Sequence, residues 1–373
     1  MIKVMTVFGT RPEAIKMAPL VKALDADAAI ESVVCVTAQH REMLDQVLEI
    51  FDIKPKHDLN IMAKGQTLSD ITSKVLKGIE AVIIKEKPDI VLVHGDTTTT
   101  FAGALAAFYQ QVPVGHVEAG LRSHNKYSPF PEEINRGLTG RIAEIHFAAT
   151  DGNIENLKSE GINLKEVIKT GNTVIDALKM VIDDQYKFDE KLLNELDYAA
   201  YKTIVMTAHR RENLGEPMEN IFSAVREIVE KNPSVQVIFP IHLNPAVREV
   251  ASRHLSGHER IHVIEPLDYE PFANLMARAD IILTDSGGIQ EEAPALGKPV
   301  VVLRTETERP EAVEAGTVVI AGVERQAIVE ITEKLIQDEA TYKKMAESVN
   351  PYGDGKASER IVEAIKAKYA DKI

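Results

Sequence analysis

The chain has 373 residues, of which 45% are hydrophobic, enough for two domains with cores of their own. Its formal net charge of −14 argues against a nucleic-acid partner, and no apolar run approaches the roughly 20 residues of a membrane helix. The single cysteine, Cys35, lies in an apolar run and fits a core residue in a reducing compartment. Because no signal-peptide pattern follows Met1, we expect a cytoplasmic protein without membrane association.

Short runs rich in Val and Ile alternate with helical patterns along the chain. Strands are expected at 2–8, 32–37, 89–94, 112–117 and 145–148, and again at 203–207, 235–240, 261–264, 280–284, 299–303 and 317–320. Fully apolar strands that alternate with helices form parallel sheets covered on both faces. We therefore expect an α/β fold with two doubly wound domains facing each other across a cleft. The turns near Thr170 suggest domains 1–170 and 171–355, with a C-terminal helix in 356–373 packing back on the first.

The first predicted strand runs into the turn Phe8-Gly9-Thr10-Arg11-Pro12-Glu13. Thr10 and Glu13 fit a capping box, and Pro12 suits a first helical turn. Helix starts at strand ends attract anions, and Arg11 and Lys16 add positive charge there. An ordinary capped helix with two solvated bases explains this motif equally well.

Three acidic residues mark the later part of the first domain. Asp96 and Glu118 each follow a predicted strand, and Glu132 opens a later helix. Because ligands of open α/β sheets bind outside the carboxyl ends of the strands, Asp96 and Glu118 belong to the ligand side. A cap or salt bridge would explain one acid, but three acids with Arg122 and Arg136 beside them indicate acid/base chemistry.

Motifs in the second domain favour a phosphate ligand. Thr284-Asp285-Ser286-Gly287-Gly288 joins a strand to a helix, and paired glycines let a phosphate approach the backbone. Glu292 lies about one helical turn beyond, where it suits a ribose diol. His209 with Arg210 and Arg211 suits a pyrophosphate, although a basic loop that neutralises nearby acids is the alternative. His242 follows another strand, where a structural histidine is equally plausible.

Several cofactor motifs are absent from the sequence. No G-x-G-x-x-G follows a strand, and there is no G-x-x-x-x-G-K-[ST], H-E-x-x-H or cysteine pair. The sequence therefore indicates neither NAD, nor ATP hydrolysis, nor a metal, and we expect no cofactor.

Taken together, the motifs resemble the non-hydrolysing UDP-N-acetylglucosamine 2-epimerases of bacterial cell-envelope polysaccharide synthesis. The matching stretches are GTRPEAIKMAPL (9–20), VHGDTTTT (93–100), GHVEAGLR (115–122), PFPEEINR (129–136), TAHRREN (207–213), TDSGGIQEEAPALGKPV (284–300) and TERPEAVEAGT (307–317). The resemblance implies the GT-B fold, with two Rossmann-like domains and a UDP-sugar between them, and a homodimer.

The resemblance also implies roles for individual residues. Asp96, Glu118 and Glu132 become the acid/base candidates, with base and acid unassigned, and His209 joins them at the pyrophosphate. The resemblance also implies ligand contacts from the first domain by Arg11 and Lys16, and contacts to the uracil by Leu267 and Phe272. The remaining implied contacts are Ser286, Gly287, Gly288 and Arg309 at the phosphates and Glu292 at the ribose.

Some bacterial members bind a second UDP-GlcNAc as an allosteric activator. The residues that match this region are Gln39, His40, Arg41, Arg210 and His242. Glu42 and Gly65 stand where several such members carry Gln and Arg.

The chemistry of epimerisation at C2 fits these residues. No carbonyl lies next to C2 of the sugar, so simple deprotonation is unfavourable, and transient oxidation would need a nicotinamide. The other route expels UDP while the C2 proton is removed, gives a 2-acetamidoglucal, and re-adds UDP after reprotonation from the other face. A hydrolysing epimerase, a GT-B glycosyltransferase and a non-catalytic UDP-sugar sensor are the competing interpretations.

Overall fold

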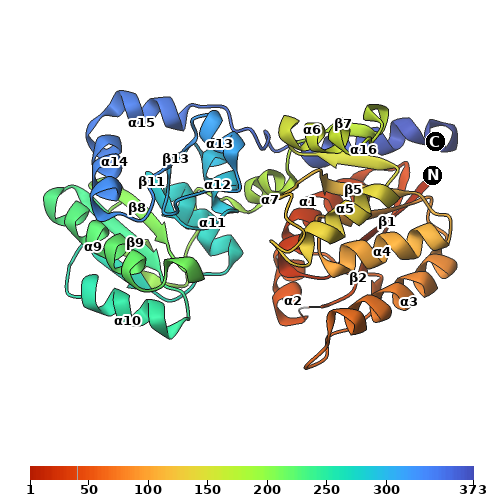
Figure 1. Ribbon diagram of the computed structural model, residues 1–373, viewed down its shortest axis with the longest axis horizontal. Coiled ribbons are helices and arrows are strands. Elements are labelled where there is room, and N and C mark those ends of the chain that lie inside the picture. Colours follow the sequence, from red (N-terminus) through yellow and green to blue (C-terminus); the bar gives the residue numbers. More distant parts are fainter. Residues whose placement is uncertain (40) are drawn as a thin grey trace. The chain divides into compact units, whose positions relative to one another are not determined.

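The computed structural model describes residues 1–39 and 41–373, which divide into two compact units (Figure 1). The first unit contains Met1–Met180 and Tyr352–Ile373, and the second contains Val181–Pro351. Among the described residues, no helix is both long and apolar enough to cross a membrane.

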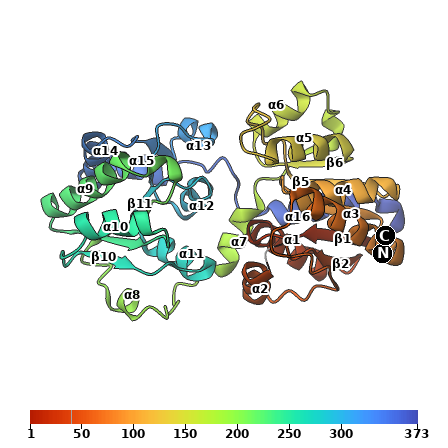
Figure 2. The ribbon, with the colours of Figure 1, turned by 60° about the horizontal axis from the view of Figure 1, so that its bottom comes forward.

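The first unit is built on a sheet of seven parallel strands in the order β3-β2-β1-β4-β5-β6-β7. These strands are β1 (Ile2–Phe8), β2 (Ile30–Val36), β3 (His57–Asp58), β4 (Ile90–His94), β5 (Val114–Ala119), β6 (Ile145–Ala148) and β7 (Val167–Lys169). The helices are α1 (Arg11–Ala26), α2 (Arg41–Ile50), α3 (Leu68–Glu86), α4 (Thr98–Tyr109), α5 (Glu132–Ile142), α6 (Asp151–Ser159), α7 (Thr173–Val181) and α16 (Ala357–Lys368). Helices α3, α4 and α5 pack in succession, and α16 packs against α1 (Figure 2).

The second unit repeats this design with six parallel strands in the order β10-β9-β8-β11-β12-β13. These strands are β8 (Lys202–Thr207), β9 (Val235–Pro240), β10 (Ile261–Ile264), β11 (Ile281–Thr284), β12 (Val300–Val302) and β13 (Val318–Ile320). The helices are α8 (Lys191–Glu195), α9 (Glu216–Lys231), α10 (Pro245–His254), α11 (Tyr269–Arg278), α12 (Ile289–Glu292), α13 (Pro310–Glu314), α14 (Arg325–Gln337) and α15 (Glu339–Ala346).

The two doubly wound parallel sheets confirm the expected α/β, GT-B-type fold class. The central strands are almost wholly apolar because helices cover both faces of each sheet, so that Val4, Val91, Val205 and Leu283 are all fully buried. The expected strands are present with bounds that shift by a residue or two, whereas the two short strands β3 and β7 were not among those expected.

The boundary between the two units lies between Met180 and Val181, ten residues after the expected position at residue 170. The first unit continues through most of α7, because that helix is tied to the returning C-terminal segment. The carboxylate of Asp176 accepts hydrogen bonds from the backbone N–H groups of Ala357 and Ser358, at 3.2 and 2.8 Å. The backbone N–H of Asn172 donates to the carbonyl of Tyr352 at 2.7 Å. These contacts hold α7 to the start of α16.

The strand order in each sheet reverses at one pair of neighbouring strands. In the first unit β1 lies between β2 and β4, and in the second β8 lies between β9 and β11. In open α/β sheets the crevice at the carboxyl ends of such a pair binds ligands. The segments after β1 and β4, and after β8 and β11, are therefore the places to look for a site.

Candidate functional site

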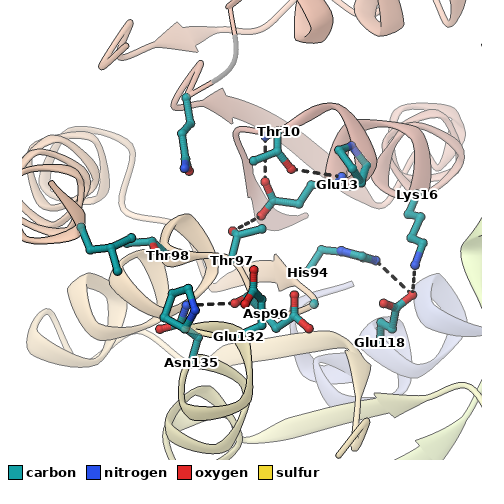
Figure 3. A pocket seen from close by; sticks show the side chains of 15 residues that line it. Thr10, Glu13, Lys16, His94, Asp96, Thr97, Thr98, Glu118, Glu132 and Asn135 are labelled. Atoms are coloured by element: carbon teal, nitrogen blue, oxygen red, sulfur yellow. Dashed lines mark hydrogen bonds and ion pairs between the residues drawn. The ribbon is translucent and has the colours of Figure 1, made fainter. Parts of the chain in front are cut away.

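A cavity of about 430 Å³ opens at the carboxyl ends of β1, β4 and β5 in the first unit (Figure 3). Its lining residues are Thr10, Pro12, Glu13, Lys16, Gln39, Leu68, His94, Gly95, Asp96, Thr97, Thr98, Glu118, Pro131, Glu132 and Asn135. The three acids singled out from the sequence, Asp96, Glu118 and Glu132, thus share one cavity with Lys16.

Glu118 sits near the end of β5 in a left-handed backbone conformation, with φ of 60°, where the register with β6 shifts. Such a conformation is uncommon for a residue with a side chain and often marks a functional site. Its Oε2 atom accepts bonds from Nζ of Lys16 at 2.5 Å and Nδ2 of Asn172 at 2.8 Å, with Nε2 of His94 at 3.6 Å. Burial raises the pKa of Glu118, but Lys16 and His94 outweigh it and hold the pKa well below its usual value.

Asp96 lies in the turn between β4 and α4, with its carboxylate 2.9 Å from a guanidinium nitrogen of Arg136. The side chain of Asn135 donates to the backbone carbonyl of Asp96 at 3.0 Å. Burial raises the pKa of Asp96, and the guanidinium of Arg136 opposes that rise only in part. Two carboxylates of one cavity therefore have pKa values moved in opposite directions, which is the pattern of an acid/base pair.

Glu132 is the first residue of α5, after Pro131. Its Oε2 atom is buried and has no hydrogen-bond partner in the described part of the chain. The neighbouring acids have structural partners instead. Glu13 accepts from the backbone of Gly9 and Thr10 as the expected capping box, and Glu133 accepts from the backbone of Ser123.

Three further residues of the first unit were singled out from the sequence. Arg122 does not join the acids, because its guanidinium pairs with both carboxylate oxygens of Glu160 at 2.6 and 2.8 Å. Arg11 begins α1 but does not line the cavity. Gln39, expected in an allosteric site, lies in the wall of the same cavity as Lys16. His40 lies outside the described residues.

Three residues that hold the acids in place were not singled out from the sequence. Asn172 binds Glu118, and Asn135 binds the turn at Asp96. The buried His116 contacts the Gly95 carbonyl through Nε2 at 2.7 Å, and burial lowers the pKa of His116 to about 3, so it remains neutral. Nothing in local sequence marks these contacts, because each joins residues at least 21 positions apart.

A second cavity, of about 200 Å³, lies at the carboxyl ends of β8 and β9 in the second unit. Its lining residues are Thr207, Ala208, His209, Pro240, Ile241, His242, Pro266, Leu267, Phe272, Ser286 and Ile289. The residues expected at a uracil, Leu267 and Phe272, therefore share a cavity with His209 and Ser286, which were expected at the pyrophosphate.

His209 is positioned by a buried carboxylate and a second imidazole. Its Nδ1 lies 3.3 Å from Oδ1 of Asp285, and its ring stacks on that of His242 with centroids 5.4 Å apart. Burial lowers the pKa of His209, and the carboxylate of Asp285 opposes this shift. Asp285 was part of the predicted glycine turn, but its link to His209 spans 76 positions and was not foreseen.

Two guanidinium groups converge on the glycine turn. A Cβ on Gly287 would lie 3.8 Å from Nη2 of Arg210 and 3.9 Å from Nη2 of Arg309, whereas a Cβ on Gly288 would meet no atom within 4 Å. Arg309 is held by Glu291 through its Nε. Open space beside a glycine turn with two nearby cations is a geometry that suits a phosphate.

Glu292 ends α12, one helical turn past Gly288 as expected. Burial raises the pKa of the Tyr269 phenol well above its usual value, and the charge of Glu292 adds to the rise.

Across the described ranges 1–39 and 41–373, no group of three His, Cys, Asp or Glu side chains could hold a metal ion.

Comparisons with known proteins extend over the whole chain. A sequence profile of the family described as UDP-N-acetylglucosamine 2-epimerase matches residues 22–366. The chain is 57% identical to the Bacillus subtilis UDP-N-acetylglucosamine 2-epimerase, over 99% of this chain and 96% of that protein.

Solved structures show the same similarity. The structure of S. aureus MnaA with UDP has a TM-score of 0.86 and 58% identity, covering 100% of this chain and 98% of that one. The structure of a Neisseria meningitidis UDP-GlcNAc 2-epimerase bound to UDP-GlcNAc has a TM-score of 0.86 and 52% identity, covering 98% of this chain and 100% of that one.

Proposed function

Because the chain belongs to the UDP-N-acetylglucosamine 2-epimerase family, we propose that it interconverts UDP-GlcNAc and UDP-ManNAc by inverting C2 without net hydrolysis. The observation that carries the proposal is the cavity of the first unit, where three carboxylates and an ammonium group meet. A site that only bound an anionic nucleotide sugar would gain nothing from three acids, whereas inversion of a carbon requires proton transfer on two faces.

Of the two acids with opposite pKa shifts, Glu118 is the one held ionised, and we assign it as the group that accepts the C2 proton. Lys16 and Asn172 both bind Oε2 of Glu118, whereas Oε1 accepts no hydrogen bond from the described residues. The cations around Glu118 keep it ionised, as a base must be. Asp96, whose pKa burial raises, holds a proton more readily and is the complementary acid. In the reverse reaction the two exchange roles.

The bonds change in a balanced sequence. The carboxylate of Glu118 takes the C2 proton, the C2–H electrons form the C1–C2 double bond of a 2-acetamidoglucal, and the C1–O bond breaks with its electrons leaving on UDP. Asp96 then returns a proton to the opposite face of C2 as the UDP oxygen attacks C1 again. The unpartnered Glu132 oxygen gives the cavity a further acceptor, for a sugar hydroxyl or amide.

UDP binding is assigned to the second unit. Leu267 and Phe272 provide an apolar surface for the base, and Glu292 is placed for the ribose. The turn at Gly287, with Arg210 and Arg309 beside it, receives the pyrophosphate. Preorganised electrostatic stabilisation is commonly the largest single contribution to enzyme catalysis, and here it would act on the departing pyrophosphate.

Incubation in heavy water tests this function. The enzyme should place deuterium at C2 of both UDP-GlcNAc and UDP-ManNAc, since proton removal and return occur at that carbon. Complete retention of hydrogen at C2 during turnover would rule out the mechanism. Steady accumulation of free UDP and ManNAc would instead identify a hydrolysing enzyme.

A homodimer is also proposed, on the family resemblance and one surface feature. The consecutive helices α3, α4 and α5 expose large apolar side chains, namely Ile84, Phe108, Tyr109, Ile134 and Leu138. Light scattering at a series of concentrations would show whether the chain is a dimer, and a monomer at all concentrations would end this proposal.

An activating second UDP-GlcNAc remains a proposal as well. Gln39 lines the cavity of the first unit, and Arg210 and His242 lie beside His209 in the second. Sigmoidal dependence of the forward rate on UDP-GlcNAc would support such an activator, and a hyperbolic dependence would count against it.

A further inference from the structure

The carboxylate of Asp285 is fully buried at the end of β11, and its two oxygens have different surroundings. Oδ2 accepts the backbone N–H groups of His209 and Arg210 at 2.8 and 2.9 Å and the side-chain amide of Asn213 at 3.1 Å. Oδ1 accepts no hydrogen bond from any described residue, and Nδ1 of His209 lies 3.3 Å from it. A buried carboxylate oxygen without a donor is costly, so this atom favours a proton on the imidazole nitrogen facing it.

The position of Asp285 therefore selects one tautomer of His209. With the proton on Nδ1 facing the carboxylate, Nε2 carries the lone pair and remains available to the cavity that His209 lines. Three bonds to Oδ2 anchor the carboxylate, so it cannot turn away from the ring. A neutral Nε2 is an acceptor, however, and a pyrophosphate oxygen is also an acceptor. The two can bond only after Nε2 gains a proton.

The other groups around His209 keep it neutral until an anion arrives. Its ring stacks on His242, whose Nδ1 accepts the backbone N–H of Asn244 at 3.1 Å. Burial lowers the pKa of His209, the Asp285 carboxylate opposes this, and His242 and Arg210 lower the pKa further. His209 is therefore neutral in the free protein at neutral pH, and an anion at Nε2 would raise its pKa.

We infer that Asp285 is a positioning residue that acts through His209, so that His209 takes up a proton from solvent at Nε2 when the pyrophosphate of UDP enters the cavity. The proton bonds to Nε2 while Nδ1 keeps its own, and the imidazolium then lies between the carboxylate and the phosphate. The inference rests on the proposed function, since it takes UDP as the ligand of this cavity. Its consequence is that the positive charge on His209 is present while UDP is bound and absent when the site is empty.

Calorimetric titration with UDP tests the inference, in buffers of different ionisation enthalpy at about pH 7.5, where the nucleotide phosphate is already ionised. Wild-type protein should take up close to one proton as UDP binds. D285N should take up much less and bind UDP roughly tenfold more weakly, because a charge-assisted contact to the imidazolium is lost. Affinity of the wild type should rise as pH falls toward the pKa of free His209 and then level off.

Asp280 offers a matched control, because it precedes β11 as Asp285 follows it and its carboxylate also accepts a backbone N–H, that of Thr203 at 2.7 Å. D280N should take up the same proton as the wild type. Tight UDP binding by the wild type without proton uptake, or full uptake by D285N, would overturn the inference while leaving the UDP site intact. Failure of UDP to bind the wild type would contradict the proposed function, because this cavity would then not be a UDP site.

Nitrogen NMR of the wild type keeps the inference testable if D285N does not fold. The His209 signals are identified by their loss in His209→Asn. The free protein should show a protonated Nδ1 and an unprotonated Nε2, and UDP should protonate Nε2. The opposite tautomer, or an unchanged ring on saturation with UDP, would contradict the role of Asp285.

Discussion

The two units share a doubly wound parallel architecture but carry different side chains at the carboxyl ends of their strands. In the first, the residues after β4 and near the end of β5 are the carboxylates Asp96 and Glu118. In the second, the segments after β8 and β11 carry His209 and a glycine turn with two guanidinium groups nearby. The fold supplies the positions at the strand ends, and the side chains placed there decide the chemistry.

The units also differ in how they use a buried carboxylate. Glu118 lies in the wall of its cavity, and Lys16 holds it ionised. Asp285 lies behind the wall of its cavity, fully buried, and acts through the imidazole in front of it. Changes in the first unit should therefore affect proton transfer at C2, and changes in the second should affect the affinity for UDP.

The largest effect is expected from Glu118→Gln, which keeps the shape of the side chain and removes the base. We expect kcat for epimerisation and for deuterium exchange at C2 to fall about 1000-fold, within the range that general-base catalysis contributes. UDP affinity should be nearly unchanged. Glu155→Gln, at an exposed site on α6, is the control. Normal turnover by Glu118→Gln would show that Glu118 is not the base that removes the C2 proton.

An intermediate effect is expected from Gly287→Ala in the second unit. The added Cβ would make only ordinary contacts in the protein, the nearest at 3.8 Å, so stability should hardly change. The methyl group would point toward Arg210 and Arg309, however, and should weaken UDP binding roughly 20-fold, as for one or two lost charge-assisted hydrogen bonds.

The matched control for Gly287→Ala is Gly137→Ala on α5, where an added Cβ meets no atom within 4 Å. That variant should bind UDP normally, as measured by calorimetry. If Gly287→Ala binds UDP as tightly as the wild type, the glycine turn is not the phosphate site.

The smallest effect is expected from Asn172→Ala, which removes one of the donors to Glu118. We expect kcat to fall about tenfold, since one hydrogen bond to a charged group is lost, with UDP affinity unchanged. Loss of a donor to the charged form raises the pKa of Glu118, so the acid side of the pH–rate profile should move to higher pH.

Asn156→Ala is the control for Asn172→Ala, because the Asn156 side chain also donates near the end of β5, but to the carbonyl of Gly120. Its pH–rate profile should match that of the wild type. If both variants lose the same activity with unshifted profiles, Asn172 serves only the fold.

Much of this molecule follows from patterns that are local in sequence. Val- and Ile-rich runs at regular spacing predict both sheets, because a strand buried on both faces must be apolar along its whole length. The capping box at Thr10 and Glu13 is confirmed, since its two partners are three residues apart. The three acids and the glycine turn were found because parallel strands bring their carboxyl ends to one edge.

Tertiary structure alone decided which of these groups touch. Sequence placed Arg122 beside the acids, but folding pairs it with Glu160, and α7 joins the first unit because Asp176 caps α16. The links from Asn172 to Glu118 and from Asp285 to His209 span 54 and 76 positions. The sequence by itself determined the sheets and the residues at their ends, because those depend on local burial and spacing. Partners and protonation depend on which distant segments share a low-dielectric interior, and only the folded chain sets that.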